Sequence, residues 1–437
     1  MKALASLYPT HIATVKERHD RALAATSFDQ VVVFSGALNV QFLDDNYYPF
    51  KTNPHFKSWV PVIDNPNCYV IYSPGRKPLL VYWQPVDYWY KPADTPSGYW
   101  VDQFDIVIIR DPEEAKQHFP KQGRTAYLGE PNALHGAGLN PEELLSRLHW
   151  ERSWKTGYEI ACIRLANEIG TRAHTAAARA FSEGRSEFEI HIDYLLASLH
   201  AEAELPYSNI IAVNENASVL HYTQHDRRHL DEGQRHSFLI DAGANVNGYA
   251  SDITRTYSRE RNEFADLIAA FDDMQQGLCR MVRPGVSYID VHMAAHHGVA
   301  KLLHDFKFVD LDAGAIVDTR ISSTFFPHGV GHFLGLQVHD VAGFHADCLG
   351  NLIAKPEGHE FLRLTRVIEP RMSFTIEPGL YFIDPLLKDL KAGDRAKHVN
   401  WSKVDEFRKF GGIRIEDDVV VTDDGCKNLT REAFAAA

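Results

Sequence analysis

Five potential metal ligands, far apart in the sequence, place the strongest constraint on the fold of this chain. They are Asp241, Asp252, His332, Glu377 and Glu416, and each lies in a short apolar or glycine-containing segment. Four carboxylates and one imidazole would balance two divalent cations, and oxygen donors suit hard cations of this kind. The direct chemical interpretation is a two-metal hydrolytic centre, for which the fold must bring all five segments together.

The first two ligands lie in a predicted β-hairpin. The segment HSFLIDA is an apolar strand ending in Asp241, GANVNGY supplies turn residues, and SDITRTY is a second strand. Alternation along this second strand puts Asp252, Thr254 and Thr256 on one face. Asp252 can then face a metal across from Asp241, with Thr254 as a supporting group. For either aspartate alone, a turn or a helix cap is the ordinary alternative.

Three histidines follow within twelve residues, in FFPHGVGHFLGLQVHD. They are His328, His332 and His339, and the glycines between them let backbone and substrate approach closely. The first two have the spacing of the helical zinc motif HExxH, but Gly329 stands where that motif needs glutamate, so we reject a zincin site. A lone histidine is ordinarily structural, whereas three together favour a functional site.

Two further acids lie on predicted strands near the C-terminus. Glu377 ends the apolar strand of SFTIEPGLYF, just before a predicted Pro–Gly turn. In GGIRIEDDVVV, alternation puts Arg414, Glu416 and Asp418 on one strand face. Arg414 and Glu416 can therefore share a site, with a plain ion pair between them as the alternative.

Composition narrows the class of protein. The 58 acidic residues outnumber the 45 basic ones, which gives a formal net charge of −13. Such a charge repels phosphate backbones and anionic membranes, although part of it belongs to carboxylates that await cations. We expect no nucleic-acid partner and no membrane partner.

The cysteines and the N-terminal segment indicate the compartment. Five scattered cysteines without CxxC spacing argue against a disulfide framework or a zinc ribbon. The N-terminus lacks a signal-peptide cleavage pattern, and no stretch reaches transmembrane length. We expect a cytoplasmic protein.

A chain of 437 residues is expected to form two domains, the larger one carrying the site. The first 150 residues predict a modest α/β domain whose strands coincide with short apolar runs. These runs are 31–34, 69–72, 79–83 and 106–109. Aromatic residues are dense around 47–48 and 83–100, where an aromatic core or an interface is favoured over a substrate pocket.

Between residues 141 and 203 the hydrophobic pattern becomes helical. One helix has an apolar stripe that includes Ile163 and Ala166, and Gly184 separates it from the next. The stripe expected to be buried on the second helix consists of Phe188, Ile192, Leu195 and Leu199. A domain boundary is predicted near 150–155, and strands resume after Pro206.

Taken together, IDAG with SDITRTY, PHGVGH with VHD, TIEPG, and GGIRIEDD resemble the pita-bread metallopeptidases, specifically the prolidase branch. LDDNYYPF and LPYSNI also look like bacterial Xaa-Pro dipeptidases and the related organophosphorus acid anhydrolases, so the resemblance covers essentially the whole chain. It implies an α+β protein. Residues 1–153 would form a smaller N-terminal α/β domain of the creatinase/prolidase type, used for dimerisation. Residues 154–437 would form a pita-bread, creatinase/aminopeptidase-like metallohydrolase domain.

The resemblance also assigns the ligands. Asp241 would bind one metal, His332 and Glu377 the other, and Asp252 and Glu416 would bridge both. Two divalent ions per subunit are implied, manganese first, with cobalt, zinc and iron as alternatives. A hydroxide bridging them would attack the scissile carbonyl.

Catalytic roles follow by the same resemblance. Glu377 would shuttle a proton, and His328 and His339 would donate hydrogen bonds to the substrate or intermediate. His221 would lie near the substrate, with a structural histidine as its alternative, and Arg414 would flank the metal site.

The two ends of a dipeptide would also find partners. Arg363 is implied to bind its C-terminal carboxylate. Asp45, reaching into the site of a partner subunit in a homodimer, would bind its free amino group. The apolar substrate pockets, for which core packing is the alternative residue by residue, would include Tyr207, Leu220, Tyr288, Val338 and Leu362.

The expected function is a manganese-dependent dipeptidase, or prolidase, acting on dipeptides with C-terminal proline. Organophosphorus triesters and fluorophosphonates are expected only as side substrates, because the same hydroxide can attack phosphorus. An aminopeptidase for longer peptides is disfavoured since Asp45 and Arg363 would fix both ends of a dipeptide. A catalytically inactive scaffold is disfavoured because no ligand is missing.

Overall fold

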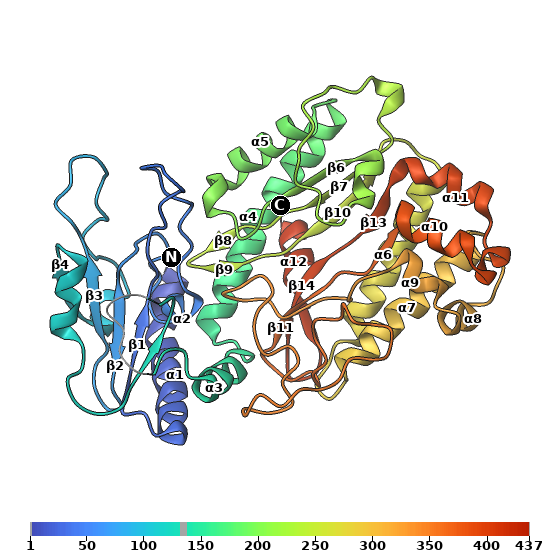
Figure 1. The fold of residues 1–437 in the computed structure, drawn as a ribbon. Helices are drawn as coiled ribbons and strands as arrows, with labels where there is room; N and C mark the ends of the chain where they lie inside the picture. The colour runs from blue at the N-terminus through green and yellow to red at the C-terminus, as the bar shows by residue number, and fades with distance from the viewer. Residues whose placement is uncertain (1, 132–137, 437) are drawn as a thin grey trace. The chain divides into compact units, whose positions relative to one another are not determined.

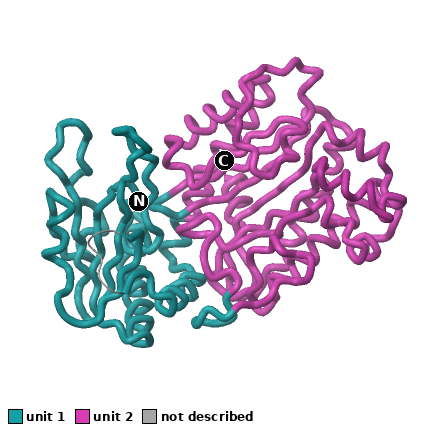
Figure 2. Tube along the Cα trace, in the orientation of Figure 1, with its two compact units in different colours: residues 1–162, 246–249, 345–351 teal, residues 163–245, 250–344, 352–437 magenta. Residues whose placement is uncertain are grey.

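The computed structural model describes residues 2–131 and 138–436. The chain divides into two compact units, each with its own internal packing (Figure 2). The first unit contains residues 1–162, 246–249 and 345–351, and the second contains 163–245, 250–344 and 352–437. The proposed ligands all belong to the second unit, so its architecture decides whether they meet.

The first unit is built on a five-stranded mixed sheet with the order β4-β3-β2-β1-β5 (Figure 1). The strands are β1 (Gln30–Phe34), β2 (Tyr69–Tyr72), β3 (Leu79–Trp83), β4 (Asp105–Ile109) and β5 (Thr125–Leu128). The helices are α1 (Lys2–Thr26) before the strands, α2 (Pro54–Lys57) between β1 and β2, and α3 (Glu142–Arg152) after β5, with short 3-10 segments at Val101–Gln103 and Pro112–His118. The four strands expected from apolar runs are confirmed, whereas β5 had not been expected.

Two loops of the first unit carry exposed aromatic and aliphatic side chains. In the first, Leu43 is 90% exposed, and in the second Tyr88 is 87% exposed. The loops touch through Tyr47 and Tyr90, whose ring centroids are 6.2 Å apart in an edge-to-face geometry. The exposed aromatics of these loops therefore lie outside the core, and an interface stays a prediction for them. Core packing is confirmed for Trp100, which is buried, and for Trp83, which packs against the core of this unit.

The second unit combines long helices with short strands. Its strands are β6 (Ile210–Val213), β7 (Ser237–Asp241), β8 (Asn245–Val246), β9 (Tyr249–Ala250), β10 (Thr254–Ser258), β11 (Ser373–Ile376), β12 (Gly379–Tyr381), β13 (Gly412–Arg414), β14 (Asp417–Val421) and β15 (Cys426–Asn428), of which β8 and β9 continue into residues grouped with the first unit. Its helices are α4 (Gly157–Ser182), α5 (Glu187–Ser198), α6 (Glu263–Met281), α7 (Tyr288–Asp305), α8 (Ala313–Asp318), α9 (Ile321–Phe325), α10 (Asp384–Ala392), α11 (Trp401–Phe407) and α12 (Leu429–Ala436). Short 3-10 segments lie at Glu202–Glu204, Asn214–Ser218, Glu232–Gln234, Asp394–His398 and Arg408–Phe410.

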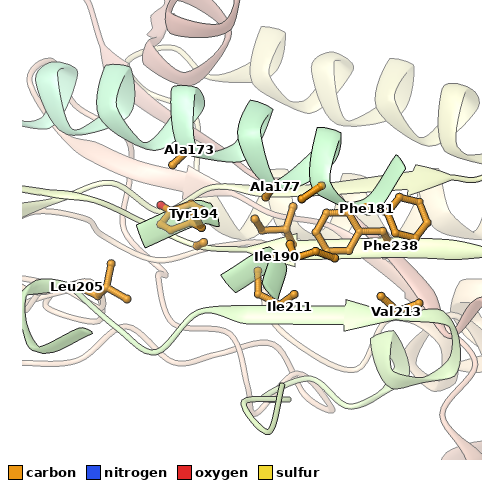
Figure 3. Packing of buried hydrophobic residues seen from close by; sticks show 12 residues of the cluster. Ala173, Ala177, Phe181, Ile190, Tyr194, Leu205, Ile211, Val213 and Phe238 are labelled. Atoms are coloured by element: carbon orange, nitrogen blue, oxygen red, sulfur yellow. The ribbon is translucent and has the colours of Figure 1, made fainter. Parts of the chain in front are cut away.

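Helices α4 and α5 pack on strands β6 and β7 (Figure 3). Small residues of α4, such as Ala173 and Ala177, allow close approach to Ile190 and Tyr194 of α5. The buried face of α5 therefore differs from the expected stripe, in which Leu199 is 88% exposed. The expectation failed because apolar residues occur on both sides of this helix, so periodicity alone did not select the buried side.

The predicted hairpin is present in a modified form. Strand β7 pairs antiparallel with β10, and Asp241 lies opposite Thr254. In the chain, the two-stranded β8-β9 ribbon lies between β7 and β10. It turns at Asn247 and Gly248, both with positive φ, as a tight hairpin turn requires. Strand β10 begins at Thr254 rather than Ser251, so Asp252 precedes the strand.

No helix within residues 2–131 and 138–436 is both long and apolar enough to cross a membrane.

Candidate metal centre

Three strand pairings align the acids in one row across the second unit. Asp241 lies opposite Thr254, and Thr254 forms a bridge with Glu416. The β11-β14 and β12-β13 pairs share one register on either side of a break, and this register puts Glu377 opposite Glu416. Directly opposed residues of a sheet point to the same face. Pairing alone therefore gathers three acids whose sequence positions span 176 residues.

The histidine segment joins the same face from the other edge of β11. Backbone bonds from Thr375 N to His332 O (3.0 Å) and from Glu377 N to Val330 O (2.8 Å) align residues 330–334 with this strand. Gly331 makes the approach feasible, because a Cβ there would lie 2.2 Å from both Thr375 O and the Tyr288 hydroxyl oxygen. Its φ of +154° is also outside the range that side chains favour. The glycines expected to permit close approach thus act on the protein's own backbone.

The side chains converge closely. His332 Nε2 lies 3.3 Å from Asp252 Oδ2 and 3.5 Å from Glu377 Oε1. Asp252, His332 and Glu416 are buried, and their donor atoms lie within 4.8 Å of one another. His332 Nδ1 donates to Phe333 O at 2.9 Å, which fixes the ring with Nε2 facing the carboxylates.

The acids cannot all stay charged without a cation. Burial raises the pKa of Glu377 to about 7, with His332 opposing and Asp252 adding to the shift. Burial and the charges of Asp252, Glu377 and Asp241 raise the pKa of Glu416 well above its usual value. Burial lowers the pKa of His332, but its bond to Asp252 and the charge of Glu377 raise it to about 9. Repulsion of this kind is what bound cations relieve.

The donor set fits divalent metal ions. Four carboxylates and one imidazole supply mostly hard donors, which suits manganese and related ions. Asp241 Oδ1 is buried and has no hydrogen-bond partner among the described residues. An orphaned carboxylate oxygen is costly in a metal-free protein, and coordination would satisfy it. The residues present are therefore compatible with the two-metal prediction.

Arg414 connects the acids but does not pair with Glu416 directly. Its Nη2 donates to Asp241 Oδ2 at 2.7 Å, and its Nε donates to Thr254 Oγ1 at 3.2 Å. Thr254 Oγ1 in turn donates to Glu416 Oε2 at 2.6 Å. The alternative of a plain Arg414–Glu416 ion pair is thus wrong, and the expected supporting role of Thr254 is directed at Glu416.

Sequence reasoning did not single out Tyr381, which lies at the end of β12. Its hydroxyl accepts from Arg414 Nη1 at 2.8 Å and lies 2.8 Å from His328 Nε2. His328 Nδ1 donates to Gly329 O at 2.8 Å, so both ring nitrogens are engaged. Burial and the Arg414 charge lower the pKa of His328 to about 3 and keep it neutral. The signal for Tyr381 in the sequence was its position two residues after the Pro–Gly pair.

Asp252 is held by Tyr207 and Asp418. Tyr207 donates its hydroxyl to Asp252 Oδ1 at 2.6 Å, so this expected pocket residue also contacts the acidic cluster. Asp252 N donates to Asp418 Oδ2 at 3.0 Å, and Asn167 donates to the same oxygen at 2.8 Å. The alternation that grouped Asp418 with Arg414 is confirmed, because both point toward this cluster.

The remaining predicted residues are distributed around the cluster. The ring centroid of His339 lies 4.3 Å from that of His332. Partial burial lowers the pKa of His339, and the charges of His332, Arg363 and His221 add to the shift. Arg363 and His221 therefore lie within electrostatic range of His339. Both of these side chains are exposed.

The expected pocket residues differ in burial. Tyr288 is fully buried and donates its hydroxyl to Thr375 O at 2.7 Å, and Leu362 is also buried. Leu220 and Val338 are half-buried. Asp45 belongs to the first unit, in an exposed turn where its N–H donates to Asp44 Oδ1 at 2.7 Å.

Buried acids around one imidazole, on one face of a strand row, define a metal-binding hydrolytic centre. Residues 161–423 match the model of metallopeptidase family M24, and residues 6–150 match the model described as Xaa-Pro dipeptidase, N-terminal domain. The chain belongs to metallopeptidase family M24. The expected α+β fold, with an N-terminal domain followed by a pita-bread domain, is confirmed.

Relatives match the chain from end to end. It is 49% identical over 437 residues to the Xaa-Pro dipeptidase of Shewanella loihica, with 99% of each chain covered. It is 48% identical over 441 residues to the Xaa-Pro dipeptidase of Pseudoalteromonas atlantica, again with 99% of each covered. Among solved structures, Escherichia coli aminopeptidase P with the inhibitor Pro-Leu superimposes with a TM-score of 0.71, covering 97% of each chain at 23% identity. That similarity concerns the fold alone.

Proposed function

We propose that this metallopeptidase is a dipeptidase that hydrolyses Xaa-Pro dipeptides. The observation that carries the proposal is the convergence of Asp252, His332 and Glu416, next to Glu377 and Asp241, in a chain 48–49% identical throughout to proteins named Xaa-Pro dipeptidase. Ordinary peptidases handle the bond before proline poorly, because its nitrogen lacks an N–H and its ring fixes the chain.

Two divalent cations would be held by the five residues predicted from the sequence. Asp241 would bind one ion, His332 and Glu377 the other, and Asp252 and Glu416 both. When bound, such ions lower the pKa of water and polarise the scissile carbonyl. Manganese is the proposed ion because carboxylate oxygens dominate the donor set, with cobalt, zinc and iron as alternatives.

Glu377 is proposed to accept a proton from the attacking water and pass it to the leaving nitrogen. Its raised pKa, about 7 in the metal-free cluster, shows that its environment favours the protonated form. Arg414 holds Asp241 and Tyr381 from one side, and Tyr381 holds His328 from the other. This chain of bonds would fix the groups that surround the scissile carbonyl.

His328 and His339 are proposed to contact the reacting groups, with His221 near the substrate. A donor role for His328 requires a proton on Nε2, which now lies against the Tyr381 hydroxyl. His339 is exposed and close to His332, so it is accessible to substrate.

Arg363 is proposed to bind the substrate carboxylate. It is exposed and lies within electrostatic range of His339, and its guanidinium suits a bidentate pair with a carboxylate. The side chain of the residue before proline would be accommodated by an apolar pocket, comprising Tyr207, Leu220, Tyr288, Val338 and Leu362.

A homodimer is proposed in which Asp45 of one protomer reaches the site of its partner and binds the substrate amino group. The support is the exposure around it, since the exposed Phe42 and Leu43 precede this acid on a loop in contact with the loop that carries Tyr88. Exposed apolar groups of this kind mark interaction surfaces. We propose residues 1–153 as the dimerisation domain and a cytoplasmic location for the enzyme.

Hydrolysis of Leu-Pro and Ala-Pro with added manganese tests the proposal. We expect turnover of both, with Leu-Ala and the tripeptide Leu-Pro-Ala cleaved far more slowly. Absence of turnover of both Xaa-Pro dipeptides would contradict it. A fluorophosphonate assayed beside Leu-Pro is expected to be the poorer substrate, since organophosphorus hydrolysis is proposed only as a side activity.

A further inference from the structure

A second cluster of potential ligands lies in the same unit and shares no residue with the four acids and one histidine above. It consists of His292, His296 and His359, from each of which one nitrogen lies within 4.8 Å of the others. His292 and His296 are buried on α7, and His359 is half-buried in a loop. No carboxylate is hydrogen-bonded to these rings in the part of the chain that the structure describes.

Secondary structure brings the three rings together. His292 and His296 are four residues apart on α7, so they occupy one helix face. His359 is the last residue of the turn Pro356–His359, which is closed by a hydrogen bond from His359 N to Pro356 O at 3.1 Å. Gly358 has a φ of +80° in that turn, as its third position often requires.

The mutual orientation of the rings is that of ligands around a point. Their centroids are 4.7, 4.8 and 4.6 Å apart, and their planes meet at 85°, 89° and 77°. The pair His191 and His225 contrasts with this, since those rings stack at 4.3 Å with 28° between planes. Stacked rings direct their nitrogens past one another, whereas near-perpendicular rings can direct them inward.

The distances are close to those of a coordinated ion. Ligand nitrogens about 2.0–2.1 Å from a tetrahedral metal are about 3.4 Å apart. His292 Nε2 and His359 Nδ1 are 2.9 Å apart, so a small adjustment would admit an ion. The Ser322 hydroxyl lies 3.1 Å from His296 Nδ1, a contact that leaves His296 Nε2 for coordination and fixes the ring.

Packing alone does not account for the cluster. His292 is 1% exposed, and its Nδ1 has no hydrogen-bond partner among the described residues. A buried polar group without a partner is destabilising, and an aliphatic residue at this position would avoid that cost. The nitrogen of His292 that faces the cluster is the other one, Nε2. Phe326 packs against the cluster, 4.7 Å from the His296 ring centroid. The nearby cation Arg320 is paired with Glu357 at 3.1 Å.

We propose that His292, His296 and His359 bind one borderline transition-metal ion, such as zinc or cobalt, which ties the 356–359 turn to helix α7. Three neutral imidazoles suit these ions and disfavour magnesium, calcium and manganese. The site differs from the acidic centre in donor chemistry and shares none of its five proposed ligands.

Zinc and cobalt binding to chelated protein, repeated in the variants H359A and H297A, tests the proposal. His297 is exposed on the same helix and serves as the matched control. We expect wild type and H297A to bind one more zinc ion per chain than H359A, with at least about 100-fold weaker binding at the altered site. Cobalt should give a tetrahedral absorption band in wild type that H359A lacks.

Equal zinc stoichiometry and affinity in wild type and H359A would overturn the proposal. Displacement at the acidic centre occurs equally in both proteins and cancels in the difference. A thermal melt checks that each variant is folded. If H359A has lost its native unfolding transition, H296Q takes its place, and its zinc stoichiometry and affinity are compared with wild type in the same way. The number of bound zinc ions is measured without peptide hydrolysis, so failure of this proposal and failure of the proposed activity can be told apart.

Discussion

The acidic centre and the histidine cluster differ in both scaffold and donor chemistry. In the former, Asp241, Glu377 and Glu416 are aligned by the register of neighbouring strands. In the latter, His292 and His296 are aligned by helix periodicity and His359 by a turn. Negative oxygen donors suit hard cations and neutral nitrogens suit borderline ones. One polypeptide can therefore offer sites for two different kinds of metal.

Electrostatics separate the two clusters further. Burial and mutual repulsion raise the pKa values of Glu377 and Glu416. Burial, followed by the charges of neighbouring histidines, lowers the pKa of His292 to about 2 and that of His296 to about 3. Burial disfavours the charged form in both cases, but that form is the anion in one and the cation in the other. The clusters should therefore respond to pH in opposite directions.

The largest expected difference is in catalysis. E416Q keeps the shape of the side chain but removes one of four negative charges, so kcat/KM for Leu-Pro should fall by about 1,000-fold, or about 4 kcal/mol. H296Q alters the other cluster and should leave kcat/KM within about threefold. Steady-state kinetics at saturating manganese measures both, with the exposed E406Q as a control. Comparable losses in E416Q and H296Q would break the distinction.

The next effect is on the stability of chelated protein. Glu377 has a folded pKa of about 7, so it favours folding below its unfolded value of 4.5, and this contribution is lost as pH rises to 7. The loss is about 3 kcal/mol. The raised pKa of His332, about 9, acts in the same direction. Denaturant unfolding of E377Q should show a flatter decline between pH 4.5 and 7 than wild type.

The histidine cluster should give the opposite slope at low pH. Because the folded pKa of His296 is depressed to about 3, its contribution is present above the unfolded value of 6.5 and decreases as pH falls. Each such group changes stability by up to about 1.4 kcal/mol per pH unit. Relative to H297A, H296Q should lose less stability between pH 6.5 and 5. An identical slope in both variants would show that the cluster does not titrate as its burial predicts.

A smaller effect is expected where the acidic centre is supported indirectly. Y381F removes the hydroxyl that accepts from Arg414 and contacts His328. Loss of such a supporting bond should lower kcat by about 10- to 100-fold, with little change in KM. The exposed Y88F serves as a control. An unchanged kcat in Y381F would mean that Arg414 and His328 hold their positions without it.

The smallest effect concerns the support of the histidine cluster. S322A removes the hydroxyl that lies 3.1 Å from His296 Nδ1. Zinc affinity at this cluster should fall by about tenfold, whereas manganese affinity at the acidic centre should not change. Competition with a chromophoric chelator measures the first, and manganese-dependent activity the second. If manganese-dependent activity changed while zinc affinity did not, Ser322 would act on the acidic centre rather than on the histidine cluster.

Much of the fold was accessible from the sequence because its signals were local. Apolar runs located β1 to β4, and Gly184 marked the break between α4 and α5. Strand β5 was missed because its four residues, TAYL, lack a long apolar run. The buried face of α5 was missed because both of its sides carry apolar residues. In each case the deciding factor was packing against a distant element.

The candidate site divides in the same way. The five proposed ligands were identifiable as acids and a histidine at strand ends or beside glycines. Tyr381 and Asp418 received no role in advance because their importance depends on hydrogen bonds to Arg414, His328 and Asp252. The same holds for His359, whose partner His292 is 67 positions away.

By itself, the sequence determined the donor types, the charge they carry and the strands and turns that present them. These are properties of single residues and short segments. Only the tertiary structure decided that Glu377 stands opposite Glu416, that Arg414 pairs with Asp241, and that three histidines form a second cluster. Strand register and helix packing set these distances, and both depend on contacts between residues far apart in the chain.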